Sequence, residues 1–346
     1  MRQVTQDLLT ERNRQVLRAV ITDYIETAEP VGSRTIARKH GVNLSPATVR
    51  NIMADLEEAG YLAQPHTSAG RVPTDRGFRI YVDTLLEVED LSTGQKERIQ
   101  RTYRGGGGPI EEVLRETSRV LSSVSQQAAL VMVPRFPSEV LRHIEFVVLG
   151  DYRILAILVS KTGIVQNRIV HWEERITQDD LEKMARYLNG ILADRTLTEV
   201  RQTILEEMQK AQVLYDRLRS QALRLSQQAL DAEGQADVYV EGTLNILNQP
   251  EFANVAQMRD LLRALEEKST LVNLLDRTIS ARGVQLFIGS ELSELIGCSL
   301  IASTYGPGDA VVGSLAVIGP TRMNYSRLIP LVSYTAAQVS RILEES

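Results

Sequence analysis

Hydrophobic residues recur at three- and four-residue intervals through the first 90 positions, which predicts a series of short amphipathic helices. The pattern indicates a first helix after Thr10, a second at residues 34–40 and a third that begins behind the N-cap Ser45. Gly60 is placed to end the third helix, and residues 61–73 have the pattern of two short strands around a polar turn. Three helices followed by a two-stranded ribbon predict a winged helix-turn-helix, with a plain three-helix bundle and hairpin as the alternative.

The polar side of the third helix carries the residue types that contact DNA. Arg50 and Asn51 face away from the apolar stripe, and each can bond bidentately to a purine edge. Thr48 and Ser45 suit phosphate contact, although Ser45 also has the structural role of an N-cap. The turn of the ribbon is polar enough to meet the DNA backbone or minor groove, and a solvated hairpin is the alternative. The candidate DNA-binding residues are Arg34, Ser45, Thr48, Arg50, Asn51, His66, Thr67, Ser68 and Arg71.

Beyond residue 90 the pattern alternates between helix and strand periods. A helix is expected after Pro109, and the segments IEFVVLG, RILAILVS and IVQNRIVHW predict an antiparallel three-stranded meander. Residues 198–232 contain no Gly or Pro and predict a long helix. Its apolar seam needs a partner, either within the chain or across a dimer. From residue 238 onward, strands and helices alternate as in an α+β domain.

Length, charge and cysteine content narrow the class of protein. A chain of 346 residues with 43% hydrophobic residues predicts two or three domains with ordinary cores. The net charge is −5, yet residues 30–80 hold seven Lys or Arg against four Asp or Glu, a net of +3, which is a modest footprint for phosphate contact. The lone cysteine, strand-length apolar runs and absence of a signal-peptide pattern predict a cytoplasmic protein without membrane contact.

Catalytic and metal-binding patterns are missing from the sequence. The four histidines stand far apart, and none is spaced with a cysteine or carboxylate as metal ligands are. The four glycines at 105–108 follow no apolar strand and precede no P-loop lysine, so they indicate a linker. Cys298 precedes an apolar strand, which favours a buried structural thiol. We therefore expect no enzyme activity, no metal and no cofactor.

Four sequence runs near the two ends of the chain are distinctive. The N-terminal runs are VGSRTIA, LSPATVRNIMADLEEAGYL and QPHTSAGRVPTDRGFRIYVD, and the C-terminal run is VVGSLAVIGPTRMNYSRLIPLV. Together they resemble the HrcA family of heat-inducible transcription repressors of bacteria. The resemblance covers both ends of the chain and implies a multidomain α+β fold. It implies a winged helix-turn-helix at 1–90, a GAF-like domain made of 91–137 and 235–346, and an α+β dimerisation domain at 138–234 inserted into it.

The resemblance also implies a function and partners. It implies a homodimer that binds an inverted-repeat operator of double-stranded DNA upstream of chaperone genes, and whose activity depends on the GroEL chaperonin. A transcription factor gated by a small molecule in the GAF-like domain is the alternative. For the dimer contact, the residues expected on the long helix are Leu214, Leu218, Ala222 and Leu225.

Overall fold

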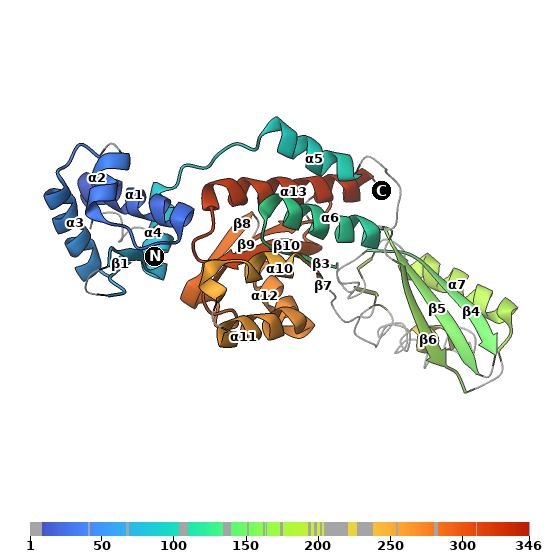
Figure 1. Cartoon of the computed structure of the whole chain (residues 1–346). Helices are drawn as coiled ribbons and strands as arrows, with labels where there is room; N and C mark the ends of the chain where they lie inside the picture. Colours follow the sequence, from blue (N-terminus) through green and yellow to red (C-terminus); the bar gives the residue numbers. More distant parts are fainter. Residues whose placement is uncertain are drawn as a thin grey trace.

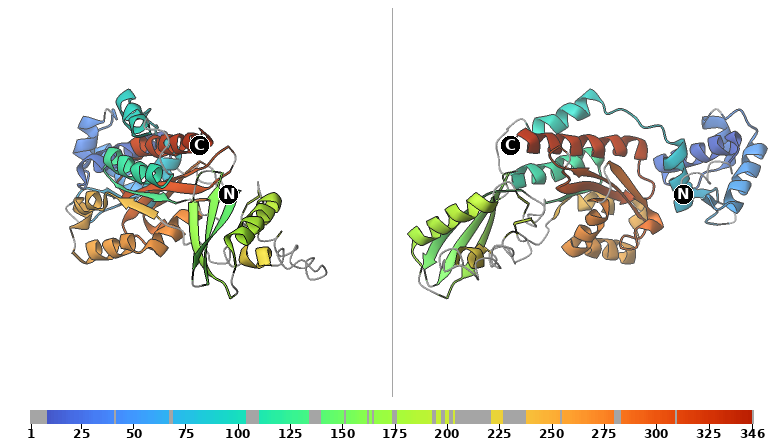
Figure 2. Two further views of the ribbon diagram at one scale, coloured as in Figure 1. Left: turned by 90° about the vertical axis from the view of Figure 1, so that its right-hand side faces the viewer. Right: turned by 180° about the vertical axis from the view of Figure 1, so that it is seen from behind.

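The computed structural model places three units in a row along the molecule (Figures 1 and 2). It describes residues 9–40, 42–66, 69–103, 110–133, 140–150, 152–161, 163, 165–173, 176–192, 195–196, 199–200, 203, 221–226, 238–253, 255–279, 283–308 and 310–345. An N-terminal unit lies at one end, a unit built on a five-stranded sheet lies in the centre, and a unit built on a three-stranded sheet lies at the other end. These names are kept below.

The N-terminal unit has the order of elements that the sequence pattern predicts. It comprises α1 (Glu11–Thr27), α2 (Ser33–Lys39), α3 (Pro46–Glu58), β1 (Leu62–Ala63), β2 (Val72–Pro73), α4 (Asp75–Ile80) and a π-helical turn, η1 (Tyr81–Leu85). The predicted bounds of the second helix are wrong by one residue at each end, because Gly32 rather than a hydroxyl residue occupies the N-cap of α2. The antiparallel ribbon pairs Leu62 with Pro73 and Ala63 with Val72.

Hydroxyl side chains begin three of the helices in this unit. Thr10 accepts a hydrogen bond from the backbone N–H of Asn13, and Ser45 accepts one from that of Thr48. Thr74 caps α4 in the same way and also donates to the carbonyl of Gly60. Each cap satisfies a donor that the first turn of a helix leaves without an intrahelical partner. The predicted caps at Thr10 and Ser45 are therefore confirmed.

A buried carboxylate ties α2 to α1. Asp23 is only 4% exposed, and its Oδ1 accepts a hydrogen bond of 2.8 Å from Nζ of Lys39 and lies 3.4 Å from Nε2 of His40. Lys39 also reaches Glu26 at 2.7 Å. Burial alone raises the pKa of Asp23, but the hydrogen bonds from Lys39 and His40 outweigh it, so the pKa is lowered.

The central unit is an antiparallel sheet with helices on both faces. The strand order is β7 (Val238–Glu241), β3 (Ala128–Met132), β10 (Gly313–Pro320), β9 (Cys298–Tyr305) and β8 (Val284–Ile288). Helices α6 (Ile110–Ser125) and α13 (Tyr325–Glu345) pack on one face with α5 (Thr93–Tyr103) outside them, whereas α10 (Thr243–Leu247), α11 (Val255–Glu266) and α12 (Lys268–Ile279) cover the other (Figure 1). Two short 3-10 turns complete the unit, η3 (Pro250–Phe252) and η4 (Gly289–Glu291).

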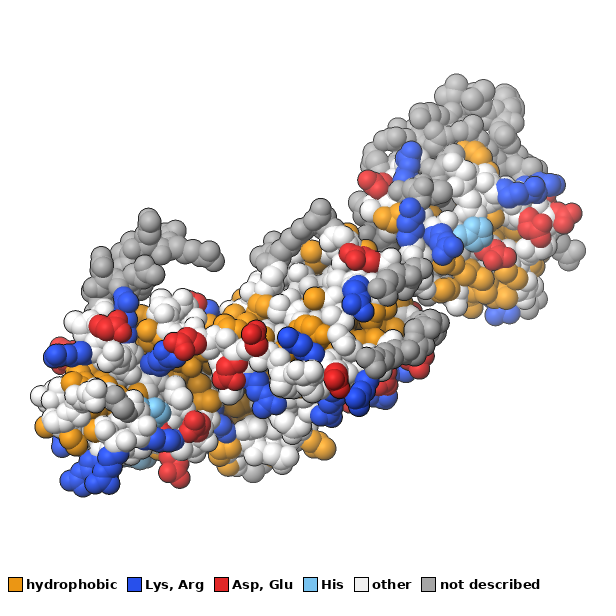
Figure 3. All heavy atoms as spheres, turned by 90° about the horizontal axis from the view of Figure 1, so that it is seen from above, with side chains coloured by type: hydrophobic (Ala, Val, Ile, Leu, Met, Phe, Trp, Pro, Cys, Tyr) orange, Lys and Arg blue, Asp and Glu red, His pale blue; other side chains and the backbone are white. Residues whose placement is uncertain are grey.

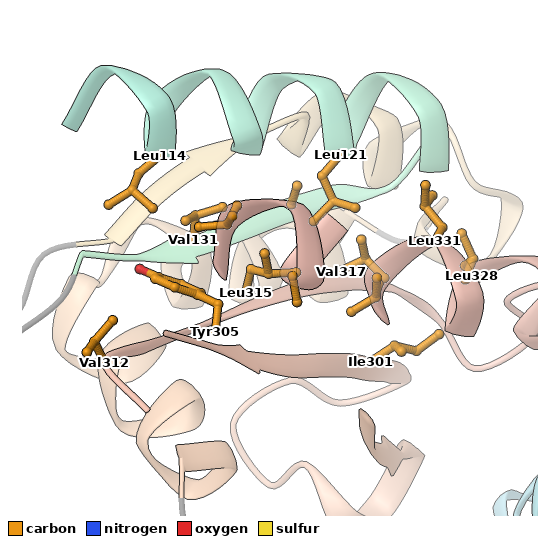
Figure 4. Close-up of a cluster of buried hydrophobic side chains, with 14 of the residues drawn as sticks. Leu114, Leu121, Val131, Ile301, Tyr305, Val312, Leu315, Val317, Leu328 and Leu331 are labelled. Carbon is orange, nitrogen blue, oxygen red and sulfur yellow. The ribbon is translucent and has the colours of Figure 1, made fainter. Parts of the chain in front are cut away.

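The central unit has a hydrophobic core on each face of this sheet, one against α6 and α13 and one against α10, α11 and α12. Leu114 and Leu121 point from α6 toward Val131, Leu315 and other strand residues (Figure 4). Every residue of β3 and β10 is buried, because helices cover both faces of the sheet. Strands covered on both faces are continuously apolar rather than alternating, which is the pattern these segments show in the sequence.

The three-stranded unit is the predicted antiparallel meander, built from β4 (Leu141–Gly150), β5 (Arg153–Ser160) and β6 (Val165–His171) and flanked by α7 (Gln178–Leu192). It arises between two neighbouring strands of the central sheet, since β3 pairs directly with β7. Of the predicted long helix, residues 199–200, 203 and 221–226 are described and helical, and the rest lies outside the described residues, as does the glycine run at 105–108. The predicted domain boundaries at 90, 137 and 234 stay predictions.

We expect Asp23→Asn to destabilise the chain by about 2 kcal/mol at neutral pH, because a carboxylate accepts stronger hydrogen bonds than an amide. A lowered pKa contributes stability above the unfolded pKa of about 3.9, and this contribution is lost as the pH falls through the folded value. The difference between the two proteins in urea unfolding, followed by circular dichroism, should persist from pH 8 to 5 and shrink below about pH 4.

The exposed Asp55 on α3 supplies the matched control. Asp55→Asn makes the same chemical change without removing a buried partner, so it should leave the unfolding curve where it is. Equal losses in the two variants, or a loss in Asp23→Asn that does not change with pH, would show that the buried cluster does not stabilise α1 against α2.

Candidate nucleic-acid interface

A hollow of about 490 Å³ lies between α2, α3 and the ribbon of the N-terminal unit. Arg34, Arg50 and Arg71, which stand far apart in the sequence, all line it. Ser33 and Gln64 line it as well, and the sequence reasoning missed both. Its remaining lining residues are Val31, Gly32, Met53, Ala69 and Gly70. The fold thus brings three of the predicted arginines to one concave surface, where their charges suit a polyanion.

The helix α3 presents the predicted residues to solvent. Val49, Ile52 and Leu56 are buried against α1 and the ribbon, whereas Arg50 and Asn51 are exposed on the opposite side. This orientation follows from the 3.6-residue period, which separates the two sets of side chains around the helix. Both exposed residues are therefore free of the core and accessible from outside the unit.

The side chains at the start of α3 bond to each other. Ser45 Oγ accepts from the backbone N–H of Thr48 at 3.1 Å and lies 2.9 Å from Thr48 Oγ1. The structural role predicted as the alternative for Ser45 is therefore present. Ser45 is also exposed, so its hydroxyl is accessible from solvent.

The ribbon is extended by a third short segment. Val31 and Arg71 exchange two backbone hydrogen bonds of 2.8 and 2.9 Å, which attach the ribbon to the chain just before α2. Gln64 closes the turn by donating to the carbonyl of Ala69 at 3.0 Å. His66 is exposed at the tip. The predicted contact residues Thr67 and Ser68 lie outside the described residues.

Arg71 joins the ribbon to α3 through its side chain. Its Nε lies 2.7 Å from Oε2 of Glu57, and the Arg71 side chain is 19% exposed. Glu57 stands in the last turn of α3, so this ion pair holds the ribbon beside the helix. The Glu57 carboxylate thus partly neutralises the charge of Arg71 in the chain without DNA. The sequence alone does not predict this pairing.

Two further arginines after the ribbon have structural partners. Arg76 donates to the carbonyl of Ala59 at 3.1 Å and lies 4.8 Å from the ring centre of Tyr61. It thereby closes the C-terminal end of α3. Arg79 instead reaches Glu291 in the central unit. Neither arginine lines the hollow.

Among the described residues, one face of the three-stranded sheet retains partly exposed aliphatic side chains. Ile154, Ala156 and Leu158 of β5 are buried on the side of α7, while the alternate residues Leu155, Ile157 and Val159 are half-buried. On the neighbouring strand, Val165 is 49% exposed and Ile169 is 55% exposed; they pair with Val159 and Leu155 respectively. Figure 3 shows hydrophobic side chains gathered over this unit. This face is called the open sheet face below.

The open sheet face is not among the sequence-based predictions, and the dimer contact predicted on the long helix stays a prediction. Ala222 and Leu225, two of the predicted contact residues, are fully buried within this chain. Leu214 and Leu218 lie outside the described residues. The signal for the open sheet face was the unbroken apolar run ILAILV, because a strand that is apolar on both sides needs cover on both sides.

One edge of this sheet is already closed. Asn189 of α7 exchanges hydrogen bonds of 2.8 and 2.9 Å with the backbone of Ile144, and Gln178 bonds to the backbone of Phe146 and Val148. These side-chain amides form hydrogen bonds with the backbone groups at the outer edge of β4, where a further strand would otherwise pair. Edge strands need such protection against unwanted pairing.

Other kinds of site find little support within the described part of the chain. No group of three or more potential metal ligands occurs there, and no helix there has the length and hydrophobicity to cross a bilayer. The thiol of Cys298 is buried, and burial raises its pKa to about 12, which is incompatible with a reactive thiolate at neutral pH. The expectation of a buried structural thiol is confirmed.

Comparison with known proteins provides the remaining evidence. The family model "HrcA protein C terminal domain" matches residues 111–329. The "Heat-inducible transcription repressor HrcA" of Geobacter sulfurreducens is 54% identical over 338 residues, covering 97% of this chain and 98% of that protein. Its counterpart in Syntrophobacter fumaroxidans is 49% identical over 344 residues, with coverage of 97% and 98%. A crystal structure titled as that of a hypothetical protein has a TM-score of 0.59 and 24% identity, covers 97% of this chain and 98% of its own, and has a similar fold.

Proposed function

Because this chain belongs to the HrcA family of heat-inducible transcription repressors, we propose that it represses chaperone operons by binding an inverted-repeat operator as a homodimer. Members of this family are transcription repressors rather than enzymes, and repression implies contact with DNA. In this proposal the N-terminal unit is a winged helix-turn-helix at 1–90, the central unit is a GAF-like domain of 91–137 and 235–346, and residues 138–234 form the inserted dimerisation domain.

The observation that carries the proposal is the hollow between α3 and the ribbon. Arg34 and Arg50 line it and are exposed, and the hollow opens beside the polar face of α3. In a winged helix, the third helix enters the major groove while flanking elements hold the backbone. Arg50 and Asn51 then contact base edges, and Arg34 and Thr48 contact phosphate. Ser45, His66, Thr67, Ser68 and Arg71 complete the proposed surface.

The open sheet face supports the proposal of a dimer. It carries aliphatic side chains of β5 and of β6, the strand whose outer edge has no described cover, with the polar Glu145 and Asn167 opposite Ile157. Exposed apolar patches of this kind are typical of protein–protein interfaces. Two copies that pack through this face about a two-fold axis would relate their N-terminal units by the same symmetry that relates the halves of an inverted repeat. Leu214 and Leu218 of the long helix stay predicted contributors.

Dependence on the GroEL chaperonin is part of the proposal through the family. In the monomer, aliphatic side chains of the open sheet face are exposed to solvent. Exposed hydrophobic surface makes a chain prone to aggregation and is the kind of surface that chaperones bind. Titration of operator DNA with and without GroEL tests this dependence, and parallel titration with metabolite pools tests the small-molecule alternative. Chromosomal footprinting tests the function itself, with protection expected over an inverted repeat upstream of chaperone genes.

We expect Arg50→Ala to reduce discrimination among operator bases by about 1–3 kcal/mol at one position of each half-site, because it removes a bidentate purine contact. Binding selection from randomised half-sites measures the change. Arg12→Ala on α1 is the control, since Arg12 is an exposed arginine of the same unit that does not line the hollow. An unchanged base preference in Arg50→Ala would remove Arg50 from the set of base-contacting residues.

We expect Arg71→Ala to weaken binding to all sequences alike and to make the dependence of log affinity on log salt less steep, by about one phosphate contact. Glu57→Gln separates the two roles of Arg71, because it releases the ion pair while keeping the arginine. Fluorescence anisotropy over a range of salt concentrations gives both slopes. If Arg71 only positions the ribbon, Glu57→Gln should weaken binding as Arg71→Ala does, and the slope should stay unchanged in both.

We expect Ile169→Glu to convert the dimer into a folded monomer with little operator affinity, since burying an unpaired carboxylate in an apolar contact is costly. Ile169 is more than half exposed in the single chain, so the substitution should not disturb the fold of the monomer. Arg186→Glu on the exposed side of α7 is the control for added negative charge. Sedimentation with circular dichroism decides the outcome, and a folded Ile169→Glu dimer would place the interface elsewhere.

A further inference from the structure

The N-terminal and central units meet around one aromatic side chain. Phe78 of α4 is 1% exposed and lies between two tyrosine rings, with ring centres 6.3 Å from Tyr24 of α1 and 6.1 Å from Tyr325 of α13. Tyr325 belongs to the central unit, where its hydroxyl donates to Thr321 and bonds to Ser299. These three tilted rings form an aromatic cluster that joins the core of one unit to that of the other.

Two charged side chains of α4 flank this aromatic cluster and attach α4 to η4. Asp75 accepts a hydrogen bond of 2.8 Å from the backbone N–H of Ser290. Arg79 pairs with both carboxylate oxygens of Glu291 and donates to the carbonyl of Leu286 at 2.9 Å. Bidentate pairs of this type fix orientation as well as distance. The approach is so close that Gly289 has no room for a side chain beside the Asp75 carboxylate.

A second attachment lies at the end of α1. Arg322, only 15% exposed, donates from Nη1 to the carbonyl of Ile25 at 3.2 Å. Carbonyls in the last turn of a helix lack an intrahelical donor and carry the negative end of the helix dipole, so a cation is favoured there. The same guanidinium is held within the central unit by Gln249 at 2.7 Å and by Glu251.

A third attachment lies in the segment that leaves the N-terminal unit. Pro330 stands inside α13 and has no N–H, so the carbonyl of Ser326 four residues earlier has no intrahelical donor. The backbone N–H of Glu89 donates to that carbonyl at 3.1 Å, and Ser326 Oγ donates to the Glu89 carboxylate at 2.9 Å. A proline within a helix thus creates the acceptor that holds the connecting segment.

These three attachments leave the DNA-facing side of the unit free. Asp75, Arg79 and Arg322 do not line the hollow, and α3 lies on the side of the N-terminal unit that faces away from the central unit (Figure 1). The contact therefore does not block α3. It determines the direction in which α3 is presented, because attachments at α1, α4 and the connecting segment prevent rotation about any single one.

We propose that Asp75, Arg79 and Arg322 form a latch that fixes the direction of α3 relative to the rest of the chain and thereby restricts the dimer to one spacing of operator half-sites. They are positioning residues for operator selection. This inference rests on the proposed function for its consequence in DNA binding. With the latch closed, the second half-site is reached at high effective concentration only when its spacing matches; a loosely tethered unit tolerates many spacings and gains less from each.

The test uses the full-length chain with Asp75→Ala, Arg79→Ala, Arg322→Ala and Glu251→Ala combined, which removes all three latch residues together with the carboxylate that pairs with Arg322 and leaves the net charge unaltered. Duplexes selected by the wild-type chain are compared with versions whose half-site separation is changed by about 5 base pairs, half a helical turn, and with a single half-site. We expect the wild type to lose about 100-fold in affinity at the wrong spacing and the variant less than about 10-fold, with equal binding to the single half-site.

The control is Glu97→Ala combined with Arg101→Ala, which removes an ion pair within α5 of the central unit and is also neutral in net charge. It should keep the wild-type spacing profile. Matching profiles in the latch variant and the wild type would overturn the proposal. If the wild type binds every inverted repeat no more tightly than a single half-site, the proposed function would be overturned instead.

A measurement without DNA tests the latch in either case. Spin labels at Arg38→Cys on α2 and Glu112→Cys on α6 report the distance between the two units, and the native Cys298 is buried and stays unlabelled. Labelled chains are diluted with unlabelled chains so that only distances within one chain are observed. The wild type should give one narrow distance distribution and the latch variant a broad one. A distribution that stays narrow in the variant would show that these side chains do not hold the units together.

Discussion

The pairing of β3 with β10 on one side and with β7 on the other is the constraint on which the architecture depends. It brings together residues 128–132, 238–241 and 313–320, so the central sheet forms only when both ends of a long intervening segment return to it. The register places Met132 opposite Val238, the last residue of β3 against the first of β7. Opposed residues in an antiparallel pair have Cα atoms about 5 Å apart, so the inserted segment leaves and re-enters the sheet at one point.

This arrangement separates three tasks along the molecule. The central sheet, buried on both faces, supplies a rigid body to which the other two units attach. The three-stranded unit closes the edge of β4 with side-chain amides, while the described aliphatic side chains of its open sheet face stay partly exposed. The N-terminal unit turns α3 and the hollow outward while its inner side is held by Phe78 and the charges around it. The proposed DNA-binding surface and the open sheet face thus lie at opposite ends of a chain whose middle is well packed (Figure 1).

The arginines of the N-terminal unit illustrate how a single residue type is divided among roles. Arg34 and Arg50 remain exposed at the hollow, Arg71 pairs with Glu57, Arg76 closes the end of α3, and Arg79 reaches another unit. All five have the same charge and similar reach. Their differences come from which acceptor lies within a few ångströms, and a carbonyl or carboxylate that is partly shielded from water attracts a guanidinium more strongly than an exposed one.

The sequence by itself determined what depends on neighbouring residues. Caps at Thr10, Ser45 and Thr74, the apolar faces of the helices and the meander all follow from local hydrogen bonding and from periods of 3.6 and 2 residues. The runs shared with the HrcA family identified the chain's class, and the outward direction of Arg50 and Asn51 follows from helical period alone.

Only the tertiary structure decided which distant residues meet. The ion pair of Arg71 with Glu57, the burial of Ala222 and Leu225 within the chain, and the open sheet face each depend on how elements far apart in sequence pack. The latch around Phe78 joins residues more than 200 positions apart, such as Arg79 and Glu291. The periodicity of hydrophobic residues shows which face of a helix or strand is apolar. It does not show which element covers that face, because burial is a property of the assembled chain rather than of any segment.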